Sequence, residues 1–544
     1  MTMRCALLVS GLMLGQAALA DTAYVNANGY TIDAAGGLAR FGTLVVADDG
    51  RVKATLAAGA PVPRGKRIDV KGRTLMPGLI DAHGHVMGLG ELALKVDLNG
   101  TTSLAEAQAR LRAYKTGSAW ITGGGWNQER WQLGRFPTAA ELDAVTGARP
   151  AFLERVDGHA GWANSRALAL AGVTAATPDP AGGRIERDAA GNPTGVLVDG
   201  AMKLVASKIP APSQRESDAM LAKSLAIMAS VGLTGAGDAG IDPATWERYQ
   251  RFARTGKLTA RIYAMAYGPD NRAAIAPQGP IGWNADDRLA MMAMKLQADG
   301  ALGSRGAWMK APYSDAPGNR GLPFFDEGAL RRIIVDASAK GFQVNVHAIG
   351  DAANGAALGA FAVVPAEQRT ALRHRDEHAQ IVAPDDLPRF ARLGIIASIQ
   401  PTHATSDKGM AEARVGAERL AGGYAWRTLI DSGVRIAAGS DFPVEPPNPF
   451  YGLHAAVTRQ SRDGQPAGGW RTNEAMTLPE AFAAFTTGAA YAEHAEDKFG
   501  TLTPGKWADF IVVDRDPFAI APATLWQVVV EETFVGGKRV YRRR

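Results

Sequence analysis

The chain has 544 residues, of which 46% are hydrophobic and 21% charged, and a formal net charge of +5. This balance excludes a disordered protein, a coiled coil and a collagen-like fibre, and no internal apolar run of about 18 residues predicts a membrane-spanning helix. The positive charges are scattered, apart from Arg542, Arg543 and Arg544 at the end. The pattern is therefore not that of a nucleic-acid-binding protein.

The first 20 residues have the pattern of a secretory signal peptide. Arg4 supplies a positive charge, residues 6–15 are mostly apolar, and Ala18-Leu19-Ala20 has the small-x-small form that signal peptidase cleaves. A membrane anchor is the alternative, but the apolar run is short for a span. We expect cleavage after Ala20, export to the periplasm and no membrane attachment afterwards. The single cysteine, Cys5, lies in this segment, so the mature chain would offer no thiolate ligand or nucleophile.

Short strand-like segments occur near both ends of the remaining chain. Residues 43–47 and 67–70 alternate or run apolar near the start, and residues 509–514 and 528–530 do so near the end. We expect residues 21–73 and 496–544 to build one composite β-sandwich.

Between these ends, strand-like and helix-like stretches alternate, which is typical of a parallel sheet with crossover helices. The sequence predicts eight strands, at Thr74–His85, Leu233–Ala239, Arg261–Tyr267, Met291–Ala298, Gln343–Ile349, Arg375–Gln380, Ile395–Gln400 and Arg435–Ser440. Eight strands favour an α/β fold with a closed (β/α)8 TIM-like barrel over an open doubly wound sheet. We place the barrel at residues 74–495, with an insertion subdomain at about 99–217 that contains four tryptophans and is expected to cap or line a pocket.

The strongest local signal is the segment from Pro77 to His85, which ends in His83-Gly84-His85. Side chains two residues apart on a strand lie on the same face, so both imidazoles can bind one cation. The alternative is a pair of polar histidines at a strand end.

Further ligand-type residues follow other predicted strands. His347 and His378 end strand-like stretches, and Asp441 follows an apolar run. All three therefore belong to the carboxyl ends of strands, where barrel active sites are built. We expect His374, His403, His454 and His494 to be ordinary polar positions, although His403 follows directly after the seventh strand and is the weakest of these assignments.

Lys295 interrupts a strand that is otherwise apolar enough to be buried. A buried ammonium must be compensated. Carboxylation by carbon dioxide would give an anionic carbamate, and an ion pair with Asp299 or Asp441 would serve equally well.

Taken together, these residues resemble the amidohydrolase superfamily, and within it the amidohydrolase family 3, the YtcJ-like branch that includes N-substituted formamide deformylases. The resemblance extends through nearly the whole mature chain. The motifs that carry it are Pro77–His85, Gly124-Gly125-Trp126, Asp157-Gly158-His159, Gly182-Gly183-Arg184-Ile185, the segment from Asp299 to Arg305, Gly439-Ser440-Asp441 and the segment from Pro504 to Asp509.

The resemblance implies a centre of two divalent ions, expected to be zinc. His83 and His85 would bind the more buried ion, and His347 and His378 the second. A carbamate on Lys295 would bridge them, and Asp441 would reach the first ion and the attacking water as a ligand and catalytic residue. We interpret Trp126, His159 and Arg305 as candidate substrate contacts, although each residue type more often has a structural role.

The predicted function is the hydrolysis of an amide-like C–N bond in a small organic substrate by metal-activated hydroxide. Two alternatives stay open. One is a deaminase or another non-amide reaction on the same scaffold, and the other is an exported binding or regulatory protein with a structural metal. Related enzymes are often dimers or larger, so a homo-oligomer is compatible with the resemblance.

Overall fold

The computed structural model describes residues 21–128, 130–156, 158, 160–180, 183–284, 286–303 and 305–544. The predicted cleavage site after Ala20 lies outside them. Within these ranges, no helix is both long and apolar enough to cross a membrane.

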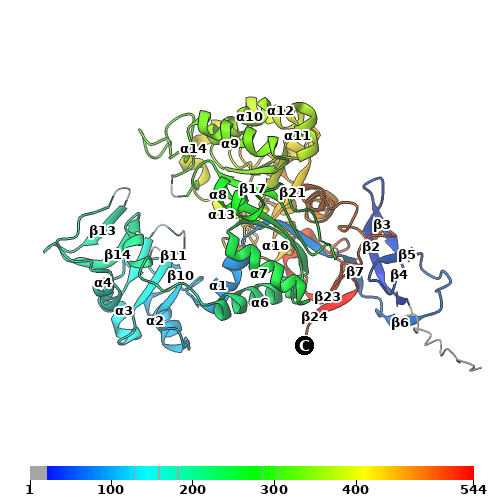
Figure 1. Ribbon diagram of the computed structural model, residues 1–544, viewed down its shortest axis with the longest axis horizontal. Helices are drawn as coiled ribbons and strands as arrows, with labels where there is room; N and C mark the ends of the chain where they lie inside the picture. Colours follow the sequence, from blue (N-terminus) through cyan, green and yellow to red (C-terminus); the bar gives the residue numbers. More distant parts are fainter. Residues whose placement is uncertain are drawn as a thin grey trace, which may run out of the picture.

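The centre of the molecule is an eight-stranded parallel sheet curled into a barrel (Figure 1). The first and last strands of this sheet are joined through the segment that follows the last strand. In this segment, Asp441 N donates a hydrogen bond to the His83 carbonyl, and the Phe442 carbonyl accepts one from His85 N, each at 2.7 Å. The predicted TIM-like barrel is therefore confirmed. Its strands are β8 (Leu79–Gly84), β15 (Leu233–Ile241), β16 (Arg261–Tyr267), β17 (Leu289–Gln297), β18 (Gln343–Ala348), β19 (Arg375–His378), β20 (Ile396–Ile399) and β21 (Ile436–Ala438).

Helix α7 (Pro243–Arg254) begins and packs as its sequence predicts. The Asp242 side chain caps the first turn by accepting the Thr245 N–H at 2.8 Å, and Pro243 fits the first helical position. Trp246, Tyr249 and Phe252 recur on one face and are buried against the barrel core. The other helices of this part of the chain are α1 (Val86–Leu94), α6 (Gln214–Ser230), α8 (Gly268–Ile275), α9 (Glu327–Ala339), α10 (Asp351–Val363), α11 (Ala366–Leu372), α12 (Leu387–Leu393), α13 (Pro401–Asp407), α14 (Ala411–Leu420), α15 (Trp426–Asp431), α16 (Pro449–Thr458), α17 (Leu478–Ala483) and α18 (Ala489–Ala492).

Two further sheets are built from the ends of the chain. One has the order β5-β4-β1-β6 and the other β24-β23-β22-β7-β2-β3. Their core includes the stacked rings of Phe510 and Phe534, 4.2 Å apart, with Tyr24 edge-on to Phe510. The strands are β1 (Thr22–Val25), β2 (Asn28–Ile32), β3 (Leu38–Phe41), β4 (Thr43–Val46), β5 (Val52–Leu56), β6 (Lys66–Asp69), β7 (Thr74–Pro77), β22 (Phe510–Val513), β23 (Val530–Val535) and β24 (Lys538–Arg542).

The first predicted barrel strand is two strands in the structure. Residues 74–77 form β7 in the terminal sheet, and β8 begins at Leu79 in the barrel. Gly78 separates them, and a Cβ at this position would lie 2.2 Å from Cγ2 of Thr234. The close approach of neighbouring chains therefore requires glycine where one sheet passes into the other.

The insertion forms its own lobe, which projects to the left of the barrel in Figure 1. Its sheet has the order β13-β14-β12-β11-β10-β9, and Trp126, Trp131 and Trp162 pack together in its core. Its elements are β9 (Val96–Asp97), α2 (Leu104–Ala113), β10 (Ile121–Trp126), α3 (Ala139–Thr146), β11 (Ala151–Arg155), β12 (Ala160–Ala163), α4 (Ser165–Ala171), β13 (Gly183–Arg187), β14 (Pro193–Asp199) and α5 (Met202–Ala206).

Candidate active site

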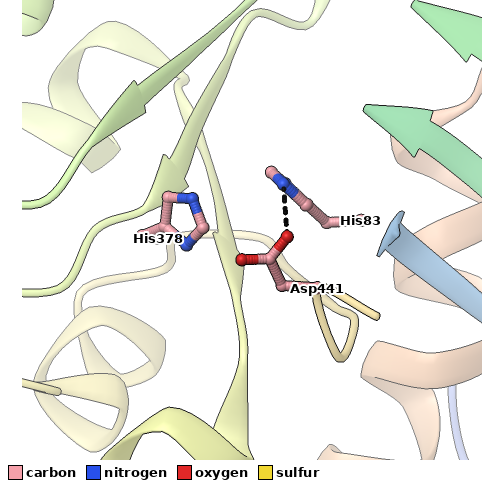
Figure 2. A group of neighbouring side chains, drawn as sticks. All are labelled: His83, His378 and Asp441. Carbon is pink, nitrogen blue, oxygen red and sulfur yellow. Dashed lines mark ion pairs between the residues drawn. The ribbon is translucent and has the colours of Figure 1, made fainter. Parts of the chain in front are cut away.

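The predicted metal ligands meet at the carboxyl ends of the barrel strands. His83 Nε2, on β8, lies 3.4 Å from Oδ1 of Asp441, and the ring of His378, on β19, has its centroid 4.9 Å from that of His83. One ligand atom from each of these three residues lies within 4.8 Å of the other two, so the group could hold a metal ion. Figure 2 shows the two imidazoles and the carboxylate facing the same space.

His85 reaches the same carboxylate from the end of β8. Its Nε2 lies 3.0 Å from Oδ1 of Asp441, and its side chain is 39% exposed, whereas that of His83 is 1% exposed. A Cβ on Gly84 would lie 2.4 Å from the ring of Phe442. The glycine between the two histidines therefore allows the strand end to pack against the segment that carries Asp441.

Asp441 has a backbone φ of 59°, which is uncommon for a residue other than glycine. Burial alone would raise the pKa of Asp441, but the hydrogen bond from His85 and electrostatic interactions with His83 and His378 hold that pKa well below its usual range. The strained backbone thus presents an ionised carboxylate to the centre, and strained positions of this kind cluster at functional sites.

His347, at the end of β18, completes the group of buried imidazoles. Its ring centroid lies 4.5 Å from that of His378. Burial, together with the charge of Lys295, lowers the pKa of His347 to about 3 and that of His83 to about 4. Both rings are therefore neutral at physiological pH, which is the form that binds metal ions.

Lys295, on β17, is buried beside these ligands. Its Nζ lies 3.3 Å from Nε2 of His83, and it forms no ion pair with any carboxylate in the described part of the chain. Asp299, one of the two partners that the sequence allowed, instead accepts the backbone N–H groups of Trp308, Ile349 and Gly350. Burial lowers the pKa of Lys295.

Some of the buried polar atoms at this site have no hydrogen-bond partner among the described residues. His347 Nε2 and His403 Nε2 are buried without a hydrogen-bond partner in the described residues. Buried polar atoms normally have partners, so unsatisfied ones at a common point indicate an ion or ligand. Neutral imidazoles and a carboxylate are ligands that suit a divalent metal.

The whole chain was also compared with known families and proteins. The model of the amidohydrolase family matches residues 66–541. The chain belongs to the amidohydrolase family. It is 34% identical to the Bacillus subtilis protein YtcJ over 92% of this chain and 96% of that protein. It is 30% identical to an N-substituted formamide deformylase of Arthrobacter pascens over 96% and 98% of the respective chains.

A solved structure supports the same conclusion. The amidohydrolase described here matches a metal-dependent hydrolase of Pyrococcus horikoshii with a TM-score of 0.77, at 28% identity over 92% of this chain and 99% of that one. It is a metal-dependent amidohydrolase, a hydrolase of carbon–nitrogen bonds other than peptide bonds, and its substrate is a small molecule. The predicted family, fold and reaction class are confirmed.

The sequence did not identify two side chains that hold the ligands of this amidohydrolase in place. Glu377 Oε2 lies 2.6 Å from Nδ1 of His83, and its other oxygen pairs with Arg375 at 2.7 Å. Gln400 Oε1 lies 2.7 Å from Nδ1 of His378. Both contacts direct the opposite ring nitrogen, Nε2, toward the centre. Both are polar residues at the ends of strands whose other residues are buried. This was the sequence signal that could have identified them.

His403 was expected to be an ordinary polar position, and the structure corrects this expectation. It lies in the first turn of α13, directly after β20, and its ring is nearly parallel to that of His378 with the centroids 5.8 Å apart. Its Nε2 lies 3.8 Å from Oδ2 of Asp441. The turn after the seventh strand therefore brings this imidazole into the site.

The three predicted substrate contacts lie in different surroundings. Trp126 is fully buried in the core of the insertion, where its indole N–H donates to the Leu153 carbonyl at 2.7 Å, so it presents no surface to a substrate in this conformation. Arg305 is held by Asp315 through two hydrogen bonds of 3.0 Å. His159 lies outside the described residues.

Proposed function

We propose that this amidohydrolase hydrolyses an N-acyl or N-formyl amide at a centre of two zinc ions. His83, His85 and Asp441 would hold one ion, and His347 and His378 the other. The proposal is supported by the close approach of His83, His378 and Asp441, by the contact of His85 with the same carboxylate and by the short distance between the rings of His347 and His378.

Lys295 would be carboxylated and join the two ion positions. The support for this role is its burial next to His83 without a carboxylate partner among the described residues. A buried ammonium that forms no direct ion pair is unfavourable, whereas a carbamate is anionic and would be neutralised by bound cations.

A divalent metal bound here would supply Lewis acidity, which lowers the pKa of coordinated water from 15.7 to about 7. Asp441 is ionised and 11% exposed at its side chain, so its carboxylate can accept a proton from the attacking water and later deliver it to the leaving nitrogen. Glu377 keeps the proton of His83 on Nδ1 through the 2.6 Å contact. The His83 ring then stays in one tautomer while Asp441 accepts and releases the proton of the attacking water.

The observation that carries the proposal is the convergence of His83, His378 and Asp441, with unsatisfied polar atoms beside them. Zinc-reconstituted protein should hydrolyse a member of a panel of N-acyl amino acids, formamides and aryl amides to a carboxylate and an amine. The Asp441→Asn variant should keep its fold and lose about 10²–10⁴-fold in turnover. Near-native turnover of Asp441→Asn with metal bound would contradict the role of this residue. Ammonia release from aminated rings without a carboxylate product would favour the deaminase alternative.

We also propose that the protein is exported to the periplasm after cleavage at Ala20. The support is the pattern of Arg4, the apolar run and Ala18-Leu19-Ala20. Mass spectrometry of protein from the periplasmic fraction should find Asp21 as the first residue. An intact N-terminus in the cytoplasmic fraction would contradict the proposal.

A further inference from the structure

The four histidines that the sequence left without a role differ in their hydrogen bonding. His374 contacts Ser338 and the backbone of Val344, and His454 lies next to Thr458. His494 contacts the carbonyl of Leu372. His403 alone among the four has a buried ring nitrogen, Nε2, without a hydrogen-bond partner in the described residues. A buried imidazole nitrogen that has no protein partner is free to bind a ligand.

The surroundings of His403 direct this nitrogen into the active site. Its ring lies over that of His378, and Nε2 lies 3.8 Å from Oδ2 of Asp441, beyond hydrogen-bond distance. The side chain of His403 is 13% exposed, although its Nε2 is buried. The two other acids near it have different donors, because Asp407 accepts from Tyr424 and Gln380 and Glu445 accepts from Ser406.

We propose that His403 is a further catalytic residue of this amidohydrolase, donating a hydrogen bond from Nε2 to the carbonyl oxygen of the amide that is cleaved. The inference rests on the proposed function of the site. Donation is favoured over acceptance because Nε2 lies 3.8 Å from the carboxylate of Asp441, which is negatively charged in its proposed role as a metal ligand. An N–H is attracted to that charge, whereas a lone pair would be repelled by it.

A donor in this position acts on the charge that develops on the carbonyl oxygen when water adds to the carbonyl carbon. The C–N bond breaks in the second step, and the nitrogen leaves with the proton that Asp441 delivers. His403 ends the cycle with the same proton on Nε2, so its role is electrostatic and it transfers no group. Removal of one such donor lowers turnover by about 10²–10³-fold.

Two variants separate this role from simple packing against His378. His403→Phe keeps a ring over His378 and removes the N–H, whereas His403→Gln removes the ring and keeps an N–H donor. We expect kcat/KM on the amide from the panel that the wild type hydrolyses to fall about 100-fold in His403→Phe, with zinc content little changed. His403→Gln should recover at least a tenth of wild-type turnover. The opposite order of the two variants, or a loss of zinc in both, would overturn the proposal.

A binding measurement tests the donor without turnover. Acetohydroxamate carries a carbonyl oxygen and serves as the probe, and its affinity for the zinc-loaded protein can be measured by calorimetry. His403→Phe should weaken binding at least tenfold. The matched control is His494→Gln, because His494 contacts Leu372 just before β19, at the opposite end of the barrel.

Equal affinity in wild type and His403→Phe would overturn the role of His403. If the wild type cleaved no amide of the panel, the proposed reaction would fail, and the acetohydroxamate titration would still decide whether His403 is a donor to a bound carbonyl.

Discussion

Glu377 and His83 form a buried pair, with Oε2 of the carboxylate 2.6 Å from Nδ1 of the ring. Burial alone would raise the pKa of Glu377, but the charges of Arg375 and His83 lower it to about 2. The carboxylate is therefore ionised, and it fixes the proton of His83 on Nδ1. Nε2 of His83 is then available to bind a metal. Glu377 therefore holds a metal ligand in position from the interior of the barrel.

The Glu377→Gln substitution tests this pair. A neutral amide of the same shape removes the charge that makes the His83 ring a stronger ligand, so zinc affinity should fall about 10–100-fold. The affinity can be measured by competition with a chelator, and circular dichroism can show that the variant is folded. Unchanged zinc affinity in a folded variant would mean that Glu377 does not support the ligand.

The Lys295→Ala substitution tests the carbamate. If a carbamate joins two ions, its removal should lower zinc content from two ions per chain to about one or fewer and abolish most activity. Short carboxylic acids such as acetate should restore part of both, because their carboxylate can occupy the space that the lysine leaves. Metal analysis and turnover with and without acetate provide the measurement, and two ions per chain in Lys295→Ala would contradict the proposed bridge.

Glu493 gives a prediction about stability and pH. Its side chain is fully buried, neither carboxylate oxygen has a hydrogen-bond partner among the described residues, and burial raises its pKa to about 8. Between the unfolded pKa near 4.5 and this value, the folded state holds one more proton than the unfolded state. The group therefore lowers the free energy of unfolding as pH rises through this window.

The Glu493→Gln substitution removes this titration. Relative to wild type, the free energy of unfolding at pH 8 should rise by about 4 kcal/mol, with little difference at pH 4.5. Urea unfolding at both pH values measures the change. An equal difference between the two proteins at both pH values would show that the carboxyl does not titrate as described.

The Trp126→Phe substitution decides between packing and substrate contact for Trp126. Loss of the indole N–H leaves the buried Leu153 carbonyl without its donor, which should lower the free energy of unfolding by about 1–3 kcal/mol. If Trp126 only packs the insertion, KM should stay at the wild-type value when assayed well below the melting temperature. A severalfold rise in KM at unchanged stability would instead support the predicted substrate contact.

The sequence predicted much of the barrel because several of its strands are mainly apolar and carry, or are followed by, a polar residue of a particular chemistry. In β17, Met291 to Leu296 is apolar except for Lys295, and β18 and β19 end near His347 and His378. An apolar run of this kind predicts a strand. The polar residue at its end is then placed at the end of the barrel where that strand finishes. The break at Gly78 escaped prediction because both halves of the segment are apolar, and only the three-dimensional contact with Thr234 separates them.

The missed site residues share a different cause. The two-residue periodicity of a strand shows which face a side chain occupies, but it does not show which partner it meets, so Glu377 and Gln400 could not be assigned. His403 lies on a short helical turn whose direction depends on tertiary packing. Trp126 was placed near a pocket because it lies in an insertion, yet the face that an insertion turns to the barrel is not encoded in its local pattern.

The most direct test of the metal centre is anomalous X-ray diffraction at the zinc edge from crystals of protein purified with zinc and bicarbonate. We expect one peak among His83, His85 and Asp441, a second beside His347 and His378, and continuous density for a carbamate on Lys295 between them. Zinc-loaded crystals with no anomalous peak at these side chains would contradict this expectation.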